Sequence, residues 1–218
     1  MTILITGANR GIGRALFDSY SAAGANTIGT CRGAAPDTGR WVSLDVTAAD
    51  AQTRLRAAMN GTPLDLLVCN AGVYADKRQN LADGYPAAIW AETFAVNVTG
   101  VFQTIQALLP NLATGTAPKI AIISSQMASQ NMAPGGSYIY RASKAAVLNL
   151  GRNLSVDLKP QGIAVGIYHP GWVVTDMGGP GAAITVDQAA QGLTARLADL
   201  SLASTGCFET WDGRAHPF

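Results

Sequence analysis

The sequence has few charged residues and no long run of either sign. Charged residues make up 13% of the 218 positions, and 15 basic against 14 acidic side chains leave a formal net charge of +1 at pH 7. Nucleic acids and anionic membranes are bound mainly through clusters of Lys and Arg, and no such cluster is present. We therefore expect neither as a partner.

Long apolar runs and paired cysteines are also missing. No stretch approaches the ~20 apolar residues that cross a bilayer, and the short apolar run at the start has no basic leader, so we expect a strand there rather than a signal peptide. The three cysteines, Cys31, Cys69 and Cys207, are odd in number and widely spaced. Metal sites use closely spaced cysteines. The pattern predicts no metal site and favours reduced thiols in a cytoplasmic protein.

Apolar residues fill 48% of the positions, and many fall in runs of strand length. These runs are TILIT, NTIGTC, WVSLDV, LDLLVCN, KIAIISS, IAVGIYH and GCFETW. Longer segments with helical periodicity lie between them. Strands that are apolar on both faces and alternate with helices predict a parallel sheet covered on both sides. We therefore expect an α/β fold of the Rossmann type, a doubly wound parallel sheet of about seven strands in a single domain.

Helix boundaries are predicted from capping residues. Thr47 is expected to cap the helix after the third strand. Pro86 is expected in the first turn of a long apolar helix. A second long helix follows Ser137 and is closed by Pro160 and Gly162.

Ligands in such sheets bind beyond the carboxyl ends of the strands. The loop after the first strand is TGANRGIG, and it has the glycine spacing G-x-x-x-G-x-G. Glycines allow a sharp turn that brings backbone N–H groups close to a phosphate, and the positive end of the next helix favours the anion. A glycine-rich turn can be purely structural, but its place between strand and helix favours a dinucleotide site. The expected cofactor contacts are Gly7, Asn9, Arg10, Gly11, Ile12 and Gly13.

The residues after the second strand indicate which cofactor is bound. Sites for NAD(H) usually offer an acid to the ribose hydroxyls, whereas an arginine suits the 2′-phosphate of NADP(H). Cys31 and Arg32 stand here without an acid, and Arg10 could add a second cation. Either arginine could also be an ordinary surface residue. We expect NADP(H) to be favoured over NAD(H).

The loops after the third and fourth strands continue this series. The carboxylate of Asp45 could accept a hydrogen bond from the adenine amine, and the small residues of NAG would let the cofactor pass closely. Each loop alone could be an ordinary turn, so their succession at strand ends is what supports the prediction. The expected contacts are Asp45, Val46, Asn70, Ala71 and Gly72.

Two tyrosines and a lysine lie close together in SYIYRASKAA. Residues i and i+4 share a helix face, so Tyr140 and Lys144 can point into one site, whereas the partner position of Tyr138 is Ala142. A phenol with a pKa near ~10 is a poor base at neutral pH, but a nearby ammonium favours the phenolate. Lys144 is thus expected to tune Tyr140 as a proton donor and acceptor. A lone Y-x-x-x-K would be weak evidence.

Ser124 and Ser125 end the fifth strand and face opposite sides of it, so only one should meet the substrate. Ser125, at the start of the loop, is the better candidate for a hydrogen bond to a carbonyl oxygen, and Ser124 should bond to backbone. Asn97 lies in the apolar helix, where an amide needs partners. It either bonds its own helix or marks a helix bulge that links water to Lys144.

The segment HPGWVVTDMGG follows the sixth strand. Its Pro-Gly turn would carry the chain over the cofactor, backbone groups beyond it could meet the carboxamide, and a hydroxyl could reach the phosphates. The expected contacts are Pro170, Gly171, Val173 and Thr175. His169 is expected to be structural rather than a catalytic base, and His216 has no visible partner.

In this order the motifs TGxxxGxG, NAG, a helical Asn, a strand-end Ser, YxxxK and PGxxxT resemble those of the short-chain dehydrogenase/reductase superfamily over essentially the whole chain. The segments YRASKAA, HPGWVVTDMGG and FETWDGRAHPF look most like the branch of small carbonyl reductases and C-factor-type signalling proteins. The resemblance implies one NAD(P)-binding domain over residues 1–218 with a short C-terminal substrate region. It implies NADPH-dependent reduction of an aldehyde or ketone, or the reverse oxidation.

The resemblance also implies a catalytic tetrad of Asn97, Ser125, Tyr140 and Lys144. Tyr140 would exchange the proton with the substrate oxygen, which Ser125 would orient and polarise. Lys144 would bind the nicotinamide ribose and lower the pKa of Tyr140, and Asn97 would hold a water in a proton relay. The expected contacts of a small carbonyl or alcohol substrate are Ser125, Gln126, Tyr140 and Trp172.

Two features depart from the family pattern. Relatives usually place the serine about thirteen residues before the tyrosine, which here falls on Met127, so the choice of Ser125 assumes a loop longer by two residues. The segment after Thr175 is short, and since many relatives use it as a substrate lid, the site is expected to be open to varied carbonyls.

Two other functions remain to be weighed against the enzyme. A nucleotide-binding signalling or regulatory protein could keep the fold and cofactor with little turnover, but it would not need the whole tetrad. A purely structural domain would make six ordered motifs an accident. A homodimer or homotetramer built on the two long helices is expected, although their apolar faces could equally be core.

Overall fold

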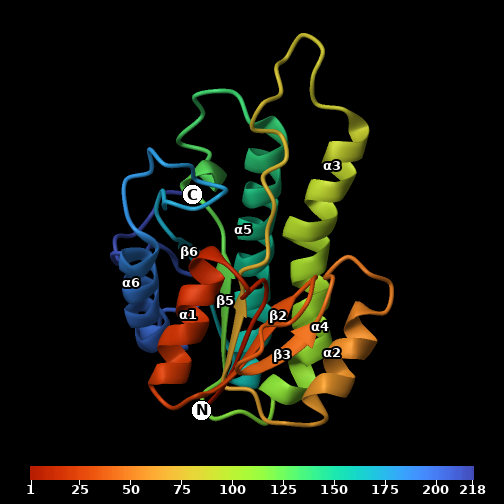
Figure 1. The fold of residues 1–218 in the computed structure, drawn as a ribbon. Coiled ribbons are helices and arrows are strands. Elements are labelled where there is room, and N and C mark those ends of the chain that lie inside the picture. The colour runs from red at the N-terminus through yellow and green to blue at the C-terminus, as the bar shows by residue number, and fades with distance from the viewer.

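Seven parallel strands form one sheet in the computed structural model, which describes residues 1–218 (Figure 1). The strand order is β3-β2-β1-β4-β5-β6-β7. The strands are β1 (Thr2–Ile5), β2 (Asn26–Cys31), β3 (Arg40–Ser43), β4 (Leu66–Cys69), β5 (Lys119–Ile123), β6 (Ala164–His169) and β7 (Phe208–Thr210). Each lies within one of the seven apolar runs, apart from Arg40 at the start of β3. The expected single-domain Rossmann-type fold is confirmed.

Helices cover both faces of the sheet (Figure 1). The α-helices are α1 (Gly11–Ala22), α2 (Ala51–Met59), α3 (Ala87–Phe94), α4 (Gly100–Leu112), α5 (Tyr138–Leu158) and α6 (Val186–Asp199). Helices α1 and α6 pack together over one face, while α2, α4 and α5 supply the core on the other. None of them combines the length and the apolarity that spanning a bilayer requires.

The alternation of side chains along each strand explains why the runs are apolar throughout. In β1, Ile3 and Ile5 join the core beneath α1 and α6, and Leu4 joins the core on the opposite face. Both kinds of position are fully buried. Because β1 pairs with β2 on one side and β4 on the other, the strand order reverses beside β1, and a crevice for ligands is expected there.

The cap predicted for α2 is wrong. The helix begins at Ala51 after Asp50, and Thr47 lies in the preceding turn, where its N–H and hydroxyl both donate to the Asp45 carboxylate. Thr47 therefore lies three residues before the N-cap position, which Asp50 occupies. Pro86 is the residue before α3 rather than a member of its first turn.

The long helix predicted before β5 contains a π-helical turn. Helices α3 and α4 are joined by η1 (Ala95–Thr99), which has Asn97 at its centre. Such bulges are rare and concentrate at functional sites. Helix α5 ends in a short 3₁₀ turn, η3 (Lys159–Gln161), followed by Gly162 in the left-handed region at φ 76°, so that helix ends as predicted.

Candidate active site

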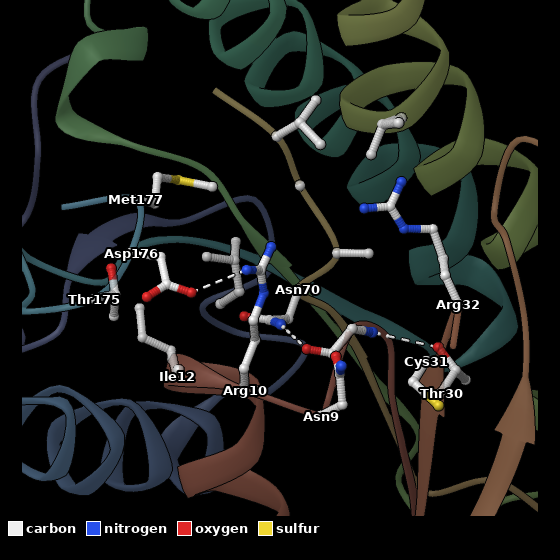
Figure 2. A pocket seen from close by; sticks show the side chains of 18 of the residues that line it. Asn9, Arg10, Ile12, Thr30, Cys31, Arg32, Asn70, Thr175, Asp176 and Met177 are labelled. Carbon is white, nitrogen blue, oxygen red and sulfur yellow. Dashed lines mark hydrogen bonds and ion pairs between the residues drawn. The ribbon is translucent and has the colours of Figure 1, made fainter. Parts of the chain in front are cut away.

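A cavity of about 710 Å³ lies at the carboxyl ends of the strands (Figure 2). Its walls come from the loops after β1 to β6 together with side chains of α5. Every residue predicted to contact the cofactor lines it except Gly171 and Val173. The cavity is large enough for a dinucleotide-sized ligand, since binding sites of small molecules and cofactors span about 300 to 1,000 Å³.

The glycine loop is tightly folded at the start of α1. Gly7 and Gly11 have φ of 63° and 53°, values that side chains with a Cβ rarely adopt. A Cβ on Gly13 would stand 2.5 Å from the carbonyl oxygen of Gly7 and would also clash with the Asn70 amide. The loop therefore needs all three glycines, and it places the N-terminal N–H groups of α1 at the cavity, where they can bind phosphate.

Hydrogen bonds join this loop to the loop after β4. The Thr6 hydroxyl accepts from the backbone N–H groups of Asn70 and Ala71, both at 3.0 Å. The Asn70 amide nitrogen donates to the carbonyl oxygens of Thr6 (2.9 Å) and Gly7 (3.0 Å). The side-chain N–H groups of Asn70 thus join the two loops, and only its side-chain oxygen is left to contact a ligand.

The two arginines differ in their partners. Arg10 forms an ion pair with Asp176 at 2.9 Å, and this pair lies across the mouth of the cavity (Figure 2). Arg32 lines the cavity and forms no ion pair. It stands on the other side of the pocket from Asp176 (Figure 2). Arg32 is therefore the cation available to an anionic ligand, whereas Arg10 would first have to leave Asp176.

Asp45 also lines the cavity. Hydrogen bonds from the N–H and hydroxyl of Thr47 hold the pKa of its carboxyl below the ordinary value, and Arg32 adds a smaller effect in the same direction. Both bonds are made to Oδ1. The other oxygen of an ionised carboxylate is thus left to accept a hydrogen bond, and the contact with an adenine amine stays a prediction.

Tyr140 and Lys144 lie one turn apart on α5 and both line the cavity, as predicted. Tyr140 is 7% exposed and Lys144 5% exposed. The ammonium donates to the carbonyl oxygen of Ile123 at 3.0 Å and lies 5.7 Å from the centroid of the tyrosine ring. The lysine is therefore held by backbone, next to the tyrosine.

The expected lowering of the Tyr140 pKa is not found. Burial raises the pKa of Tyr140 to about 12, and the nearby Ser125 hydroxyl only partly offsets this. Burial also lowers the pKa of Lys144 to about 8. Removal from water disfavours each charged form more than their mutual attraction favours it. At neutral pH the phenol keeps its proton, which suits a proton donor.

The two strand-end serines differ in their place and their partners: Ser124 lines the cavity, which was not predicted, and Ser125 does not. Ser124 Oγ donates to the backbone oxygen of Lys144 at 3.1 Å and is buried. Ser125 precedes the short 3₁₀ helix η2 (Gln126–Ala128), and its hydroxyl accepts from the N–H of Met127 at 3.1 Å. The Ser125 hydroxyl acts to lower the pKa of the Tyr140 phenol, so it lies near that group, and Ser124 has no such effect.

Asn97 joins η1 to two other segments. Its Oδ1 accepts from the N–H of Val73 at 2.9 Å, and its Nδ2 donates to the Val73 carbonyl at 2.9 Å and to Ser143 Oγ at 3.0 Å. The interpretation that it bonds its own helix is wrong, and the predicted bulge is present. Gly72 permits this approach, because a Cβ there would lie 3.3 Å from Asn97 Oδ1 and 3.4 Å from Lys144 Nζ.

Two residues of the loop after β6 that were predicted to contact the cofactor, Gly171 and Val173, do not line the cavity. Gly171, at φ 91°, packs against Ile184 and Trp211. Val173 is 4% exposed and its carbonyl accepts from the Thr175 hydroxyl at 3.3 Å. Pairing of this segment with residues near Ile184 turns both positions inward. Pro170 and Thr175 do line the cavity.

The predicted substrate residues lie on the two loops beside the phenol. Gln126 is the first residue of η2. Trp172 is 53% exposed, and its indole N–H donates to the Gly178 carbonyl at 2.9 Å, which fixes the ring on the loop after β6. Neither residue lines the cavity, and their contact with a substrate stays a prediction.

His216 does have partners, contrary to the sequence-based interpretation. The centroid of its ring lies 4.9 Å from that of Phe208 and 5.9 Å from that of His169, and its backbone N–H donates to the Phe208 carbonyl at 2.8 Å. His169 is buried with Nδ1 unpartnered, and burial, aided by His216, lowers its pKa to about 4. The tail folds back on β7, and a neutral His169 supports the predicted structural role.

Sequence reasoning missed several walls of the cavity. Asp176 and Met177 lie directly after the PGxxxT motif, and Ile123 is the last residue of β5. These residues are close to predicted site residues in the sequence, and that proximity is the only feature that could have indicated them. The missed residues are Thr30, Cys31, Gly33, Leu44, Val73, Val96, Ile123, Ser124, Val174, Asp176, Met177 and Val186.

Comparison with known proteins gives a family match and related sequences. Residues 1–183 match the family described as short chain dehydrogenase. The chain is 36% identical over 157 residues to C-signal of Myxococcus xanthus, covering 72% of this chain and 93% of that protein. It is 32% identical over 225 positions to 1-hydroxy-2-glutathionyl-2-methyl-3-butene dehydrogenase of Rhodococcus sp. (strain AD45), covering 97% of each.

A solved structure agrees in fold. The NADPH-bound carbonyl reductase from chicken fatty liver matches with a TM-score of 0.90 at 29% identity, covering 100% of this chain and 98% of that one. The family match extends over most of the chain, and the parallel sheet with a cavity at its carboxyl edge is consistent with it. The protein therefore belongs to the short-chain dehydrogenase/reductase family and is an oxidoreductase.

Proposed function

We propose that this protein reduces an aldehyde or ketone to an alcohol with NADPH, with Tyr140 as the general acid. One observation carries the proposal: a buried phenol, whose pKa burial raises to about 12, lies near Ser125 and one turn from Lys144, at the wall of a cavity of about 710 Å³. The N-terminus of α1 and the tightly packed glycine loop fit the pyrophosphate of a dinucleotide there. The nicotinamide, when bound, supplies the hydride.

Each residue of the site then has one task. Tyr140 donates its proton to the carbonyl oxygen as negative charge develops on it. Ser125 donates a hydrogen bond to the same oxygen and holds it beside the phenol. Lys144, cationic below about pH 8, binds the nicotinamide ribose and lowers the energy of the phenolate. Asn97 Oδ1 accepts one hydrogen bond, from the N–H of Val73, and so keeps a lone pair for a water.

The substrate, we propose, is a small carbonyl compound or alcohol that enters past Gln126 and Trp172. A panel of aromatic aldehydes, α-diketones and β-keto esters, with NADPH consumption as the readout, tests the function. Turnover of at least one member is the expected result. The 36% identity to C-signal favours one alternative, a nucleotide-binding signalling protein. NADPH binding without turnover of any member would favour that alternative.

Arg32→Ala is expected to reduce the preference for NADPH over NADH. Arg32 lines the cavity and forms no ion pair, so its guanidinium can donate a charge-assisted hydrogen bond to the 2′-phosphate. Such a bond contributes about 1.5 to 3 kcal/mol, so the ratio of the two affinities should fall by roughly 10- to 100-fold. Fluorescence titration with each cofactor measures this ratio.

Arg14→Ala is the matched control for Arg32. Arg14 pairs with Asp18 on the surface of α1 and does not line the cavity. Its removal should leave the ratio of NADPH to NADH affinity unchanged. An unchanged ratio in Arg32→Ala as well would contradict the assigned role.

We also propose a homodimer or homotetramer that acts in the cytoplasm. Phe102 on α4 and Val156 on α5 are 39% and 70% exposed, which supports contact between copies through the two long helices. The three cysteines are all free thiols, which suits a reducing compartment. Sedimentation equilibrium would show a monomer if the proposed assembly is incorrect.

A further inference from the structure

The helix that carries Tyr140 begins in an unusual way. Its N-cap, Ser137, is left-handed at φ 49° and follows two more left-handed residues, Gly135 and Gly136. A serine at this position normally has extended backbone, and its hydroxyl accepts from the second or third N–H of the helix. Ser137 makes no such bond. The first turn of α5 therefore depends on a partner from another part of the chain.

Asp76, in the loop between β4 and α3, is that partner. Its Oδ2 accepts from the N–H of Ile139 at 2.8 Å, and the N–H of Tyr140 lies 3.2 Å from Oδ1 and 3.4 Å from Oδ2. The side chain is 1% exposed and forms no ion pair. Burying an unpaired carboxylate is costly. The N–H groups and the positive end of α5 are what compensate it.

A second residue of the same loop holds the side chain of Tyr140. The Tyr74 ring stacks on the Tyr140 ring with centroids 4.2 Å apart and an interplanar angle of 23°. The Tyr74 hydroxyl is hydrogen-bonded to Ser137 Oγ at 2.5 Å. The Ser137 hydroxyl, which does not cap the helix, therefore has Tyr74 as its partner instead. Backbone and ring of Tyr140 are thus both held from one short stretch of the chain.

The other side of this stretch is joined to the π-helical turn. The amide of Asn97 makes two hydrogen bonds of 2.9 Å to the backbone of Val73. Residues 73–76 therefore connect η1 with the start of α5, at the carboxyl edge of the sheet where the loop before α3 and the loop before α5 both lie (Figure 1). A shift of this stretch would move Tyr140 relative to Ser125.

We propose that Asp76, assisted by Tyr74, is a positioning residue for proton transfer by Tyr140. Asp76 fixes the backbone of Tyr140 at the second and third N–H groups of the helix, and Tyr74 fixes the plane of the phenol. Neither touches the reacting atoms. This inference rests on the proposed function, since it concerns the same acid.

Asp76→Asn tests the proposal with the smallest change of shape. The amide keeps one acceptor oxygen, but it loses the charge and turns its NH₂ group toward at least one N–H donor at the start of α5. A small displacement of a reacting group can cost as much as ~100-fold, so kcat should fall by roughly 10- to 100-fold. The NADPH dissociation constant should stay near wild type. The solvent deuterium isotope effect on kcat should rise, because proton delivery becomes slower than the other steps.

Asp65→Asn is the matched control. Asp65 also accepts from two backbone N–H groups, those of Thr2 and Thr116, both at 2.7 Å, but it lies at the opposite edge of the sheet. This variant should lower the melting temperature without changing kcat or the isotope effect. Tyr74→Phe is the second variant: it keeps the stacked ring, loses the bond to Ser137, and decides the question if Asp76→Asn does not fold.

The outcomes separate the proposals. A lower kcat with a larger isotope effect and unchanged NADPH affinity supports positioning. A wild-type kcat overturns it, and so does a parallel loss of kcat, NADPH affinity and melting temperature, which would make Asp76 a purely structural cap. If Tyr140→Phe is inactive while Asp76→Asn is normal, only the positioning fails. If Tyr140→Phe keeps full turnover, the proposed acid itself is wrong.

Discussion

Replacing Tyr140 with phenylalanine is expected to abolish carbonyl reduction while sparing NADPH binding. The ring is buried and stacked on Tyr74, so phenylalanine should fill the same space. Only the hydroxyl beside Ser125 is lost, and with it the proton donor. General acid catalysis contributes roughly 10² to 10⁴-fold, so kcat should fall by about that factor.

The measurement compares kcat for the best carbonyl of the panel with the NADPH dissociation constant. Tyr138→Phe is the matched control, because Tyr138 lies two residues away, is 39% exposed and contacts Tyr85 edge to face at 5.1 Å. It does not line the cavity, so its kcat should remain normal. Full turnover in Tyr140→Phe would refute the mechanism.

Raising the pH above about 8 is expected to switch off reduction. Burial lowers the pKa of Lys144 from 10.5 to about 8, so this group loses its charge within the working range. Burial raises the pKa of Tyr140 to about 12, so the phenol stays protonated throughout. With one essential group deprotonating, kcat/KM for NADPH should be level below pH 8 and fall about tenfold per pH unit above it.

The free energy of unfolding should rise with pH between about pH 8 and 10.5, while the activity falls. Between pH 8 and 10.5 the unfolded chain holds a proton on Lys144 that the folded chain has released, so this group makes folding more favourable as the pH rises. Unfolding through Lys144 therefore cannot explain a loss of activity there. Lys144→Arg keeps its charge at every working pH and should remove the decline. A wild-type profile that stays level to pH 10 would contradict the assignment.

The fold followed from short-range patterns in the sequence. Apolar runs such as TILIT predicted parallel strands because both faces of each strand are buried, and the helices between them predicted the covering layers. The glycine loop was equally readable, since Gly7, Gly11 and Gly13 are needed for local backbone geometry and close packing. Such features depend on neighbours along the chain, which a sequence displays directly.

Several local predictions were wrong because contacts between distant residues decided them. Thr47 is a reasonable cap by residue type, but it lies in a turn with Asp45, and the helix begins only after Asp50. The partner of His216 was invisible because the tail folds back on β7. The pKa of Tyr140 moved upward because burial, which periodicity does not measure, outweighs a lysine held by the Ile123 carbonyl.

The sequence by itself determined the doubly wound fold, the family and the residues from which the site is built. Only the tertiary structure decided the state of those residues: which arginine forms an ion pair, that burial raises the pKa of Tyr140, and that Asp76 binds the start of the helix that carries Tyr140. The reason is physical. Periodicity and turn chemistry act over a few residues, whereas desolvation and hydrogen-bond partners depend on groups such as Asp76 and Tyr140, which are 64 positions apart in the chain.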